Sequence, residues 1–210
     1  MLKWLLAGLC TILPLWCGEH ESPGSIALYV DFQHQPPAEV VEALQQEVEV
    51  IMAPMGAEIE WRSLKAASGG EVSTQLAVVK FLGRCEAIGF AAPHAVKPGA
   101  LGWTHVSDGF ILPFSDIDCD GIRQFIQIGL LGIDGKNRAE AYGRAVGRVL
   151  AHELYHIFAN TTHHGTNGVG KAVYSVRDLL SPDFHFEEHE SDILRASRPR
   201  TVVDIEDDTH

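Results

Sequence analysis

The sequence predicts a single α+β domain in which a mixed, twisted β-sheet precedes a long histidine-bearing helix and a shorter C-terminal helix. Three observations support this prediction. Segments with strand-like alternation dominate the first half of the chain. A long helical pattern with two histidines four residues apart follows them. The 210 residues contain no internal repeat or Pro- or Ser-rich linker that would divide the domain.

The first elements are a strand, a helix and two further strands. Residues 26–32 (IALYVDF) are rich in strand formers, and a proline pair opens a helix over residues 36–52. Residues 57–62 alternate between apolar and polar side chains, which is typical of a strand. Residues 74–82 (TQLAVVKFL) are apolar enough to lie centrally in the sheet.

A predicted surface loop over residues 86–99 leads to a hairpin. Residues 101–106 and 110–114 flank the turn sequence Ser107-Asp108-Gly109 and are expected to pair. Two helices follow the hairpin, a short one over residues 122–128 and the long one over residues 139–159. A last helix is predicted near residues 187–196.

Three aspartates precede the short helix. Asp116, Asp118 and Asp120 have the alternate spacing of a calcium loop, but no Glu stands where an EF-hand requires one. We therefore interpret them as the acidic, capped start of the helix.

The two ends of the chain differ from the domain between them, which we place at residues 23–200. Lys3 and the apolar run from Trp4 to Trp16 predict a secretory signal peptide over residues 1–22, because this run is too short to span a bilayer. We expect a secreted or periplasmic protein, with lipid attachment at Cys17 as the alternative. Residues 201–210 are expected to form a disordered tail.

Cysteine content and charge restrict the environment and the partners. Without the signal peptide, Cys85 and Cys119 remain, and in an oxidising compartment we expect them to form a disulfide, with two separate thiols as the alternative. The formal net charge of -12 argues against binding nucleic acid, which needs a basic face. We predict no membrane span in the mature chain.

The long helix contains a candidate zinc site. His152 and His156 lie four residues apart, so their ring nitrogens can reach one zinc ion from the same helix face. Glu153 then lies beside the metal without binding it, where it can accept a proton from a zinc-bound water. Apolar neighbours along this helix indicate burial, and buried histidines are costly without a partner.

A third protein ligand is needed if water is to occupy the fourth position. His164 is favoured, because Gly165 beside it lets the backbone turn away, and His163 is the alternative. Asn160 can adopt a left-handed conformation and end the helix before both of them.

This pattern resembles the metzincin clan of zinc endopeptidases, whose helix reads His-Glu-x-x-His-x-x-Gly-x-x-His on a domain with its sheet before the helix. The AHELYH run at residues 151–156 also resembles a small group of secreted bacterial proteins. In the clan pattern the Gly falls at Ala159 and the third His falls at Thr162. His163 and His164 therefore stand one and two positions late.

Two further features bear on this resemblance. The clan has a methionine turn beneath the metal, but this chain has Met only at positions 1, 52 and 55, so another side chain near residues 174–180 would take that place. Residues 188–193 are similar to the Glu-x-x-Ser-Asp helix of thermolysin-like peptidases. In that arrangement Glu188 would be the third ligand and Asp192 would support a histidine. An exposed acidic helix is the favoured interpretation, because this segment is charged on most sides.

The sequence thus predicts a secreted zinc metalloendopeptidase that acts on a protein or peptide, with Zn²⁺ as cofactor and Glu153 as general base. The alternative is a non-catalytic zinc-binding protein on a peptidase-like fold. In that case His163 and His164 would together complete four protein ligands with His152 and His156.

Overall fold

The computed structural model describes residues 24–69, 73–89 and 99–197. The predicted signal peptide, the predicted tail and most of the predicted loop over residues 86–99 lie outside the described residues. Within the described ranges, no helix is both long and apolar enough to cross a membrane.

Five strands of the described chain form one mixed sheet, in the order β2-β1-β3-β5-β4. They are β1 (Ser25–Phe32), β2 (Glu58–Ser63), β3 (Gln75–Leu82), β4 (Gly102–Ser107) and β5 (Phe110–Asp118). Strands β2, β1, β3 and β5 are parallel, whereas β4 pairs antiparallel with β5 at the edge. The predicted mixed sheet and hairpin are confirmed, and β3 is the middle strand, as its apolar sequence predicted.

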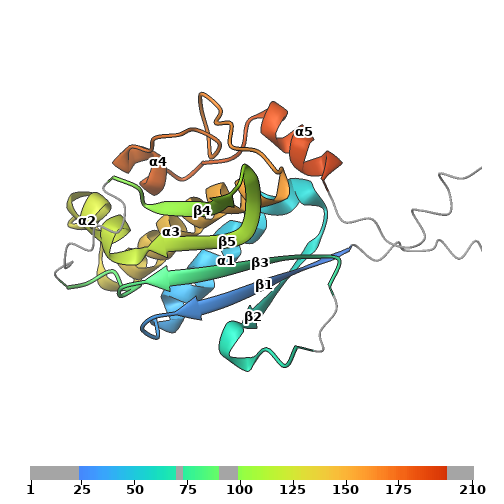
Figure 1. Ribbon diagram of the computed structural model, residues 1–210. Coiled ribbons are helices and arrows are strands. Elements are labelled where there is room, and N and C mark those ends of the chain that lie inside the picture. Colours follow the sequence, from blue (N-terminus) through green and yellow to red (C-terminus); the bar gives the residue numbers. More distant parts are fainter. Residues whose placement is uncertain (1–23, 70–72, 90–98, 198–210) are drawn as a thin grey trace, which may run out of the picture.

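The α-helices of the described chain are α1 (Ala38–Met52), α2 (Cys119–Leu130), α3 (Gly135–Phe158), α4 (Val176–Leu180) and α5 (Glu188–Ala196). Figure 1 shows α1 and α3 side by side behind the sheet, with α4 and α5 above the edge strand β4 in this view. The sequence did not predict α4. Its five residues are too few to show a helical period in the sequence. A capping box between Ser175 and Asp178 stabilises the start of this helix.

The core lies between the sheet and the helix pair α1 and α3. Leu28 of β1 and Phe81 of β3 are fully buried there. The two helices pack closely because α3 has a glycine at the contact: a Cβ added at Gly143 would lie 2.6 Å from the carbonyl oxygen of Val40. Because the Gly143 side of α3 packs against α1, another face of α3 is turned towards the edge strand β4.

Helix α3 ends as the sequence predicted. Asn160 has a φ of 46°, in the left-handed region, and therefore reverses the chain after the last turn. The following segment returns along the helix, because Thr161 contacts His156 and Val169 contacts His152, one turn further back.

The predicted disulfide between Cys85 and Cys119 is present. It ties the chain after β3 to the first residue of α2. Asp118 caps this helix as predicted, since its carboxylate accepts a hydrogen bond of 2.8 Å from the Gly121 N–H. Asp116 is not part of the helix start. It lies on β5 and its carboxylate is 2.6 Å from Nε2 of His105.

Replacing both cysteines with alanine should lower the free energy of unfolding by about 3 kcal/mol, because the unfolded chain regains the entropy of a large loop. Urea denaturation followed by circular dichroism, with and without reductant, measures this difference. The double variant should not respond to reductant, which makes it the control. A wild-type transition that reductant leaves unchanged would contradict the expectation.

Candidate metal centre

His152 and His156 lie on one face of α3 and are both 8% exposed. The Nδ1 atom of His152 is 2.8 Å from the carbonyl oxygen of Val169, and that of His156 is 2.7 Å from the carbonyl oxygen of Thr161. A carbonyl oxygen only accepts hydrogen bonds, so both Nδ1 atoms carry a hydrogen. The two carbonyl groups thereby fix the tautomer of both rings.

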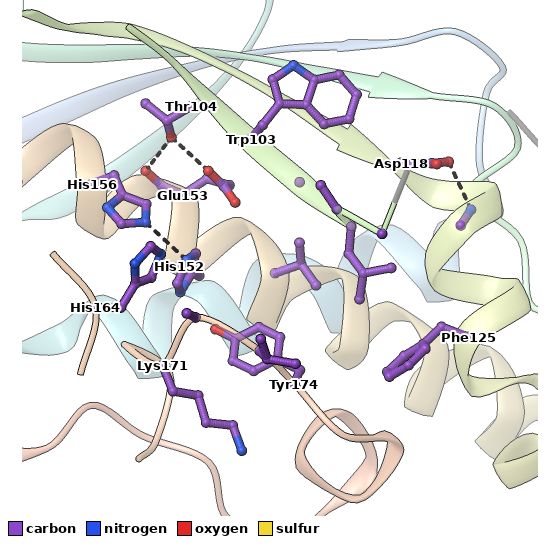
Figure 2. A pocket seen from close by; sticks show the side chains of 18 of the residues that line it. Trp103, Thr104, Asp118, Phe125, His152, Glu153, His156, His164, Lys171 and Tyr174 are labelled. Carbon is purple, nitrogen blue, oxygen red and sulfur yellow. Dashed lines mark hydrogen bonds between the residues drawn. The ribbon is translucent and has the colours of Figure 1, made fainter. Parts of the chain in front are cut away.

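With a hydrogen on each Nδ1, the Nε2 atoms of the two rings have their lone pairs free, and the two lone pairs face each other. The two Nε2 atoms are 3.0 Å apart and are joined by a dashed line in Figure 2. Burial lowers the pKa of His152 to about 3 and also lowers the pKa of His156, so both rings are neutral near pH 7 and neither Nε2 carries a proton. A cation between the two nitrogens would remove their mutual repulsion. Two nitrogen ligands of a tetrahedral zinc ion lie about 3.3 Å apart, which is close to the observed separation.

A third histidine, His164, reaches the same place from the segment after α3. Its ring centroid is 5.2 Å from that of His152 and 4.8 Å from that of His156. One ligand atom from each of the three residues can be chosen so that all lie within 4.8 Å of one another. His164 is exposed, so the cluster is buried on the helix side and open on the other. The set of three imidazoles suits zinc.

The other candidates from the sequence do not join this cluster. His163 is exposed, and its backbone N–H donates to the Thr161 hydroxyl at 3.1 Å. The side chain of Glu188 is 84% exposed and pairs with Arg195, which also pairs with Asp192. Glu188 and Asp192 therefore lie on an exposed face, in keeping with the favoured interpretation of this segment. Helix α5 turns these two acids to solvent and presents Glu190 and Leu194 to the protein instead.

Glu153 is 5% exposed and lines the same cavity as the histidines. Its Oε2 accepts a hydrogen bond of 2.8 Å from the hydroxyl of Thr104 on β4, as Figure 2 shows. The Thr104 oxygen also lies 2.9 Å from that of the buried Ser115 on β5. The Thr104 hydroxyl therefore lies between the Ser115 hydroxyl of the sheet and the Glu153 carboxylate of the helix.

Gly102 allows this contact between β4 and α3. A Cβ at Gly102 would lie 2.9 Å from Cγ1 of Val149 and 3.1 Å from Cγ of Glu153. Gly102 and Thr104 are two residues apart and so point to the same face of the strand. Sequence reasoning gave neither residue a role, and this alternation is the only sequence feature that relates them.

Tyr174 lies on the other side of His152. Its ring centroid is 5.6 Å from that of His152, in an edge-on arrangement, and its hydroxyl donates to the Val169 carbonyl oxygen. Burial and, second to it, the Glu153 carboxylate raise the pKa of the Tyr174 hydroxyl well above its ordinary value, so it keeps its proton. Within the segment 174–180, Tyr174 therefore lies against a cluster histidine.

A cavity of about 830 Å³ extends from the histidines towards α2. Figure 2 shows Trp103 and Thr104 of β4 above it, the histidines at one end and Phe125 of α2 at the other. Away from the histidines its lining is mostly apolar, with contributions from Leu101, Phe125, Val149 and Val173. The arrangement can bind a metal beside a protonatable carboxylate, next to room for a large apolar group.

Comparison with solved structures agrees with this architecture. No family model matches the chain, and no curated protein matches it in sequence. Among solved structures, it is similar to archaemetzincin from Methanopyrus kandleri, with a TM-score of 0.51 and 14% sequence identity. The match covers 85% of this chain and 97% of that chain. At this identity the similarity shows the fold alone, and it agrees with the single α+β domain that the sequence predicted.

Proposed function

We propose that this chain is a zinc-dependent peptidase in which His152, His156 and His164 bind the metal. The observation that carries the proposal is the pair of Nε2 lone pairs held face to face on α3, with a third imidazole beside them. Because His163 lies outside the cluster, three protein ligands leave one position for water, as in catalytic rather than structural zinc sites.

Glu153 acts as the general base and then the general acid. Bound zinc would lower the pKa of its water and polarise the scissile carbonyl group. Glu153 lines the cavity beside the three histidines, where its carboxylate can accept the proton of the attacking water and deliver it to the leaving amine. The hydrogen bond from Thr104 fixes the orientation of this carboxylate.

The substrate is an extended peptide or protein segment. Strand β4 forms the edge of the sheet and lines the cavity, so its backbone can pair with an extended chain. The apolar lining between Leu101 and Phe125 favours a large apolar side chain next to the cleaved bond. The disulfide supports action in an oxidising compartment, either the cell exterior or the periplasm.

Glu153→Ala should abolish peptide cleavage while leaving the zinc content near one ion per chain, because Glu153 moves protons but does not bind the metal. Cleavage of a peptide library and metal analysis of the same sample measure the two quantities. Glu140→Ala is the matched control, since Glu140 lies on the same helix and pairs only with Arg144 at the surface in the described structure. Full cleavage by Glu153→Ala would contradict the mechanism.

Residues that only support a metal ligand typically contribute about 10- to 100-fold to metal affinity. His164→Ala removes a ligand and should therefore weaken zinc binding by more than this. His163→Ala removes the neighbouring imidazole and should change zinc affinity by less than about twofold. Competition with a chromophoric chelator gives both dissociation constants. The reverse order of the two variants would assign the third ligand to His163.

Thr104→Val should lower kcat by about 10- to 100-fold with little change in KM, because the Glu153 carboxylate loses the hydroxyl that orients it. Thr104→Ser keeps this hydroxyl and should restore most of the rate. Steady-state kinetics on one cleaved peptide compare the three proteins at equal zinc content. Equal kcat values in the wild type and Thr104→Val would show that Glu153 is oriented without Thr104.

A further inference from the structure

We propose that Tyr174 is a positioning residue of the metal site, which acts on His152 through the backbone carbonyl group of Val169. The inference rests on the proposed metal site, but it does not depend on peptide hydrolysis. Tyr174 does not belong to the three-histidine cluster, and its hydroxyl donates to a backbone oxygen rather than to a histidine.

The Val169 carbonyl oxygen accepts two hydrogen bonds. One comes from Nδ1 of His152 at 2.8 Å and the other from the Tyr174 hydroxyl. A carbonyl oxygen has two lone pairs, so both bonds can form together. The direction of this carbonyl group is therefore set by the His152 ring on α3 and by the Tyr174 hydroxyl on the cavity wall.

The carbonyl group of Val169 lies in a loop. Val169 lies between Gly168 and Gly170, and its carbonyl group is not part of a helix or strand. Its side chain is fully buried and its N–H donates to the His185 carbonyl oxygen at 3.0 Å. These contacts hold the side chain and the N–H of Val169. The Tyr174 hydroxyl instead donates to the carbonyl oxygen, which is the atom that also accepts the hydrogen bond from His152.

The consequence for the metal follows from the tautomer of His152. The Val169 oxygen holds the hydrogen on Nδ1 and so leaves the Nε2 lone pair for a metal. Without the Tyr174 hydroxyl, this oxygen can rotate, and the His152 ring is less well oriented towards His156 and His164. Groups that support a metal ligand in this way typically contribute about 10- to 100-fold to metal affinity.

Tyr174→Phe tests the inference without removing ring contacts. The ring packs edge-on against Phe184, at 5.3 Å between centroids, as well as against His152, and phenylalanine keeps both contacts. The zinc dissociation constant, measured by competition with a chromophoric chelator, should rise by about 10-fold. In the zinc-free variant, long-range ¹H–¹⁵N NMR should show that His152 no longer holds its hydrogen on Nδ1 alone.

Tyr142→Phe is the matched control. Tyr142 is also buried, and its hydroxyl donates to the backbone carbonyl oxygen of Cys119 at 2.7 Å, at a site that is not part of the histidine cluster. The control should lose thermal stability to a similar degree but keep the zinc affinity of the wild type within about twofold.

The outcomes separate this inference from the proposed function. Wild-type zinc affinity in Tyr174→Phe, or an equal loss in both phenylalanine variants, would overturn the positioning role. A wild-type protein that binds no zinc would overturn both the role and the metal site. Zinc binding without any peptide cleavage would overturn the proposed peptidase, whereas a selective loss of zinc affinity in Tyr174→Phe would still support the inference.

Discussion

The candidate site depends on two backbone carbonyl groups that accept hydrogen bonds from the histidines of α3. Because the Thr161 and Val169 oxygens bind Nδ1 of His156 and His152, both Nε2 lone pairs must face the same small volume. Two such lone pairs 3.0 Å apart are unfavourable unless a cation lies between them. The structure thus contains a local conflict that a metal ion would relieve, and sites that conflict with folding preferences are often functional.

The rest of the fold supplies these two carbonyl groups. The left-handed Asn160 reverses the chain after α3, so that the next segment returns past His156 and then past His152. The buried Arg148 holds the far part of this segment, because it donates to the Asp178 carbonyl oxygen at 2.8 Å and pairs with Glu47 of α1. From the other side, β4 approaches α3 closely at Gly102 and brings the Thr104 hydroxyl to Glu153. Helix, returning loop and edge strand therefore enclose one end of the cavity.

Much of this arrangement was predictable from the sequence, because it depends on local patterns. Strand alternation and helical period predicted the sheet, its middle strand and α3, and the four-residue spacing of His152 and His156 predicted their common face. The contributions of Thr161 and Val169 come from backbone atoms, which the sequence does not distinguish. Thr104 and Tyr174 reach the site only through tertiary packing. Residues 188–193 are similar to a thermolysin-like helix, but short acidic patterns also suit an exposed helix such as α5, which was the favoured interpretation.

A crystal structure of the zinc-loaded protein, with anomalous data collected at the zinc absorption edge, tests the central claim most directly. The account predicts one zinc ion bound at about 2.0–2.1 Å by nitrogen atoms of His152, His156 and His164, with both Nδ1 atoms of the α3 histidines still bonded to backbone carbonyl groups. A zinc ion bound by His163 or Glu188, or no anomalous peak between the two Nε2 atoms, would contradict it.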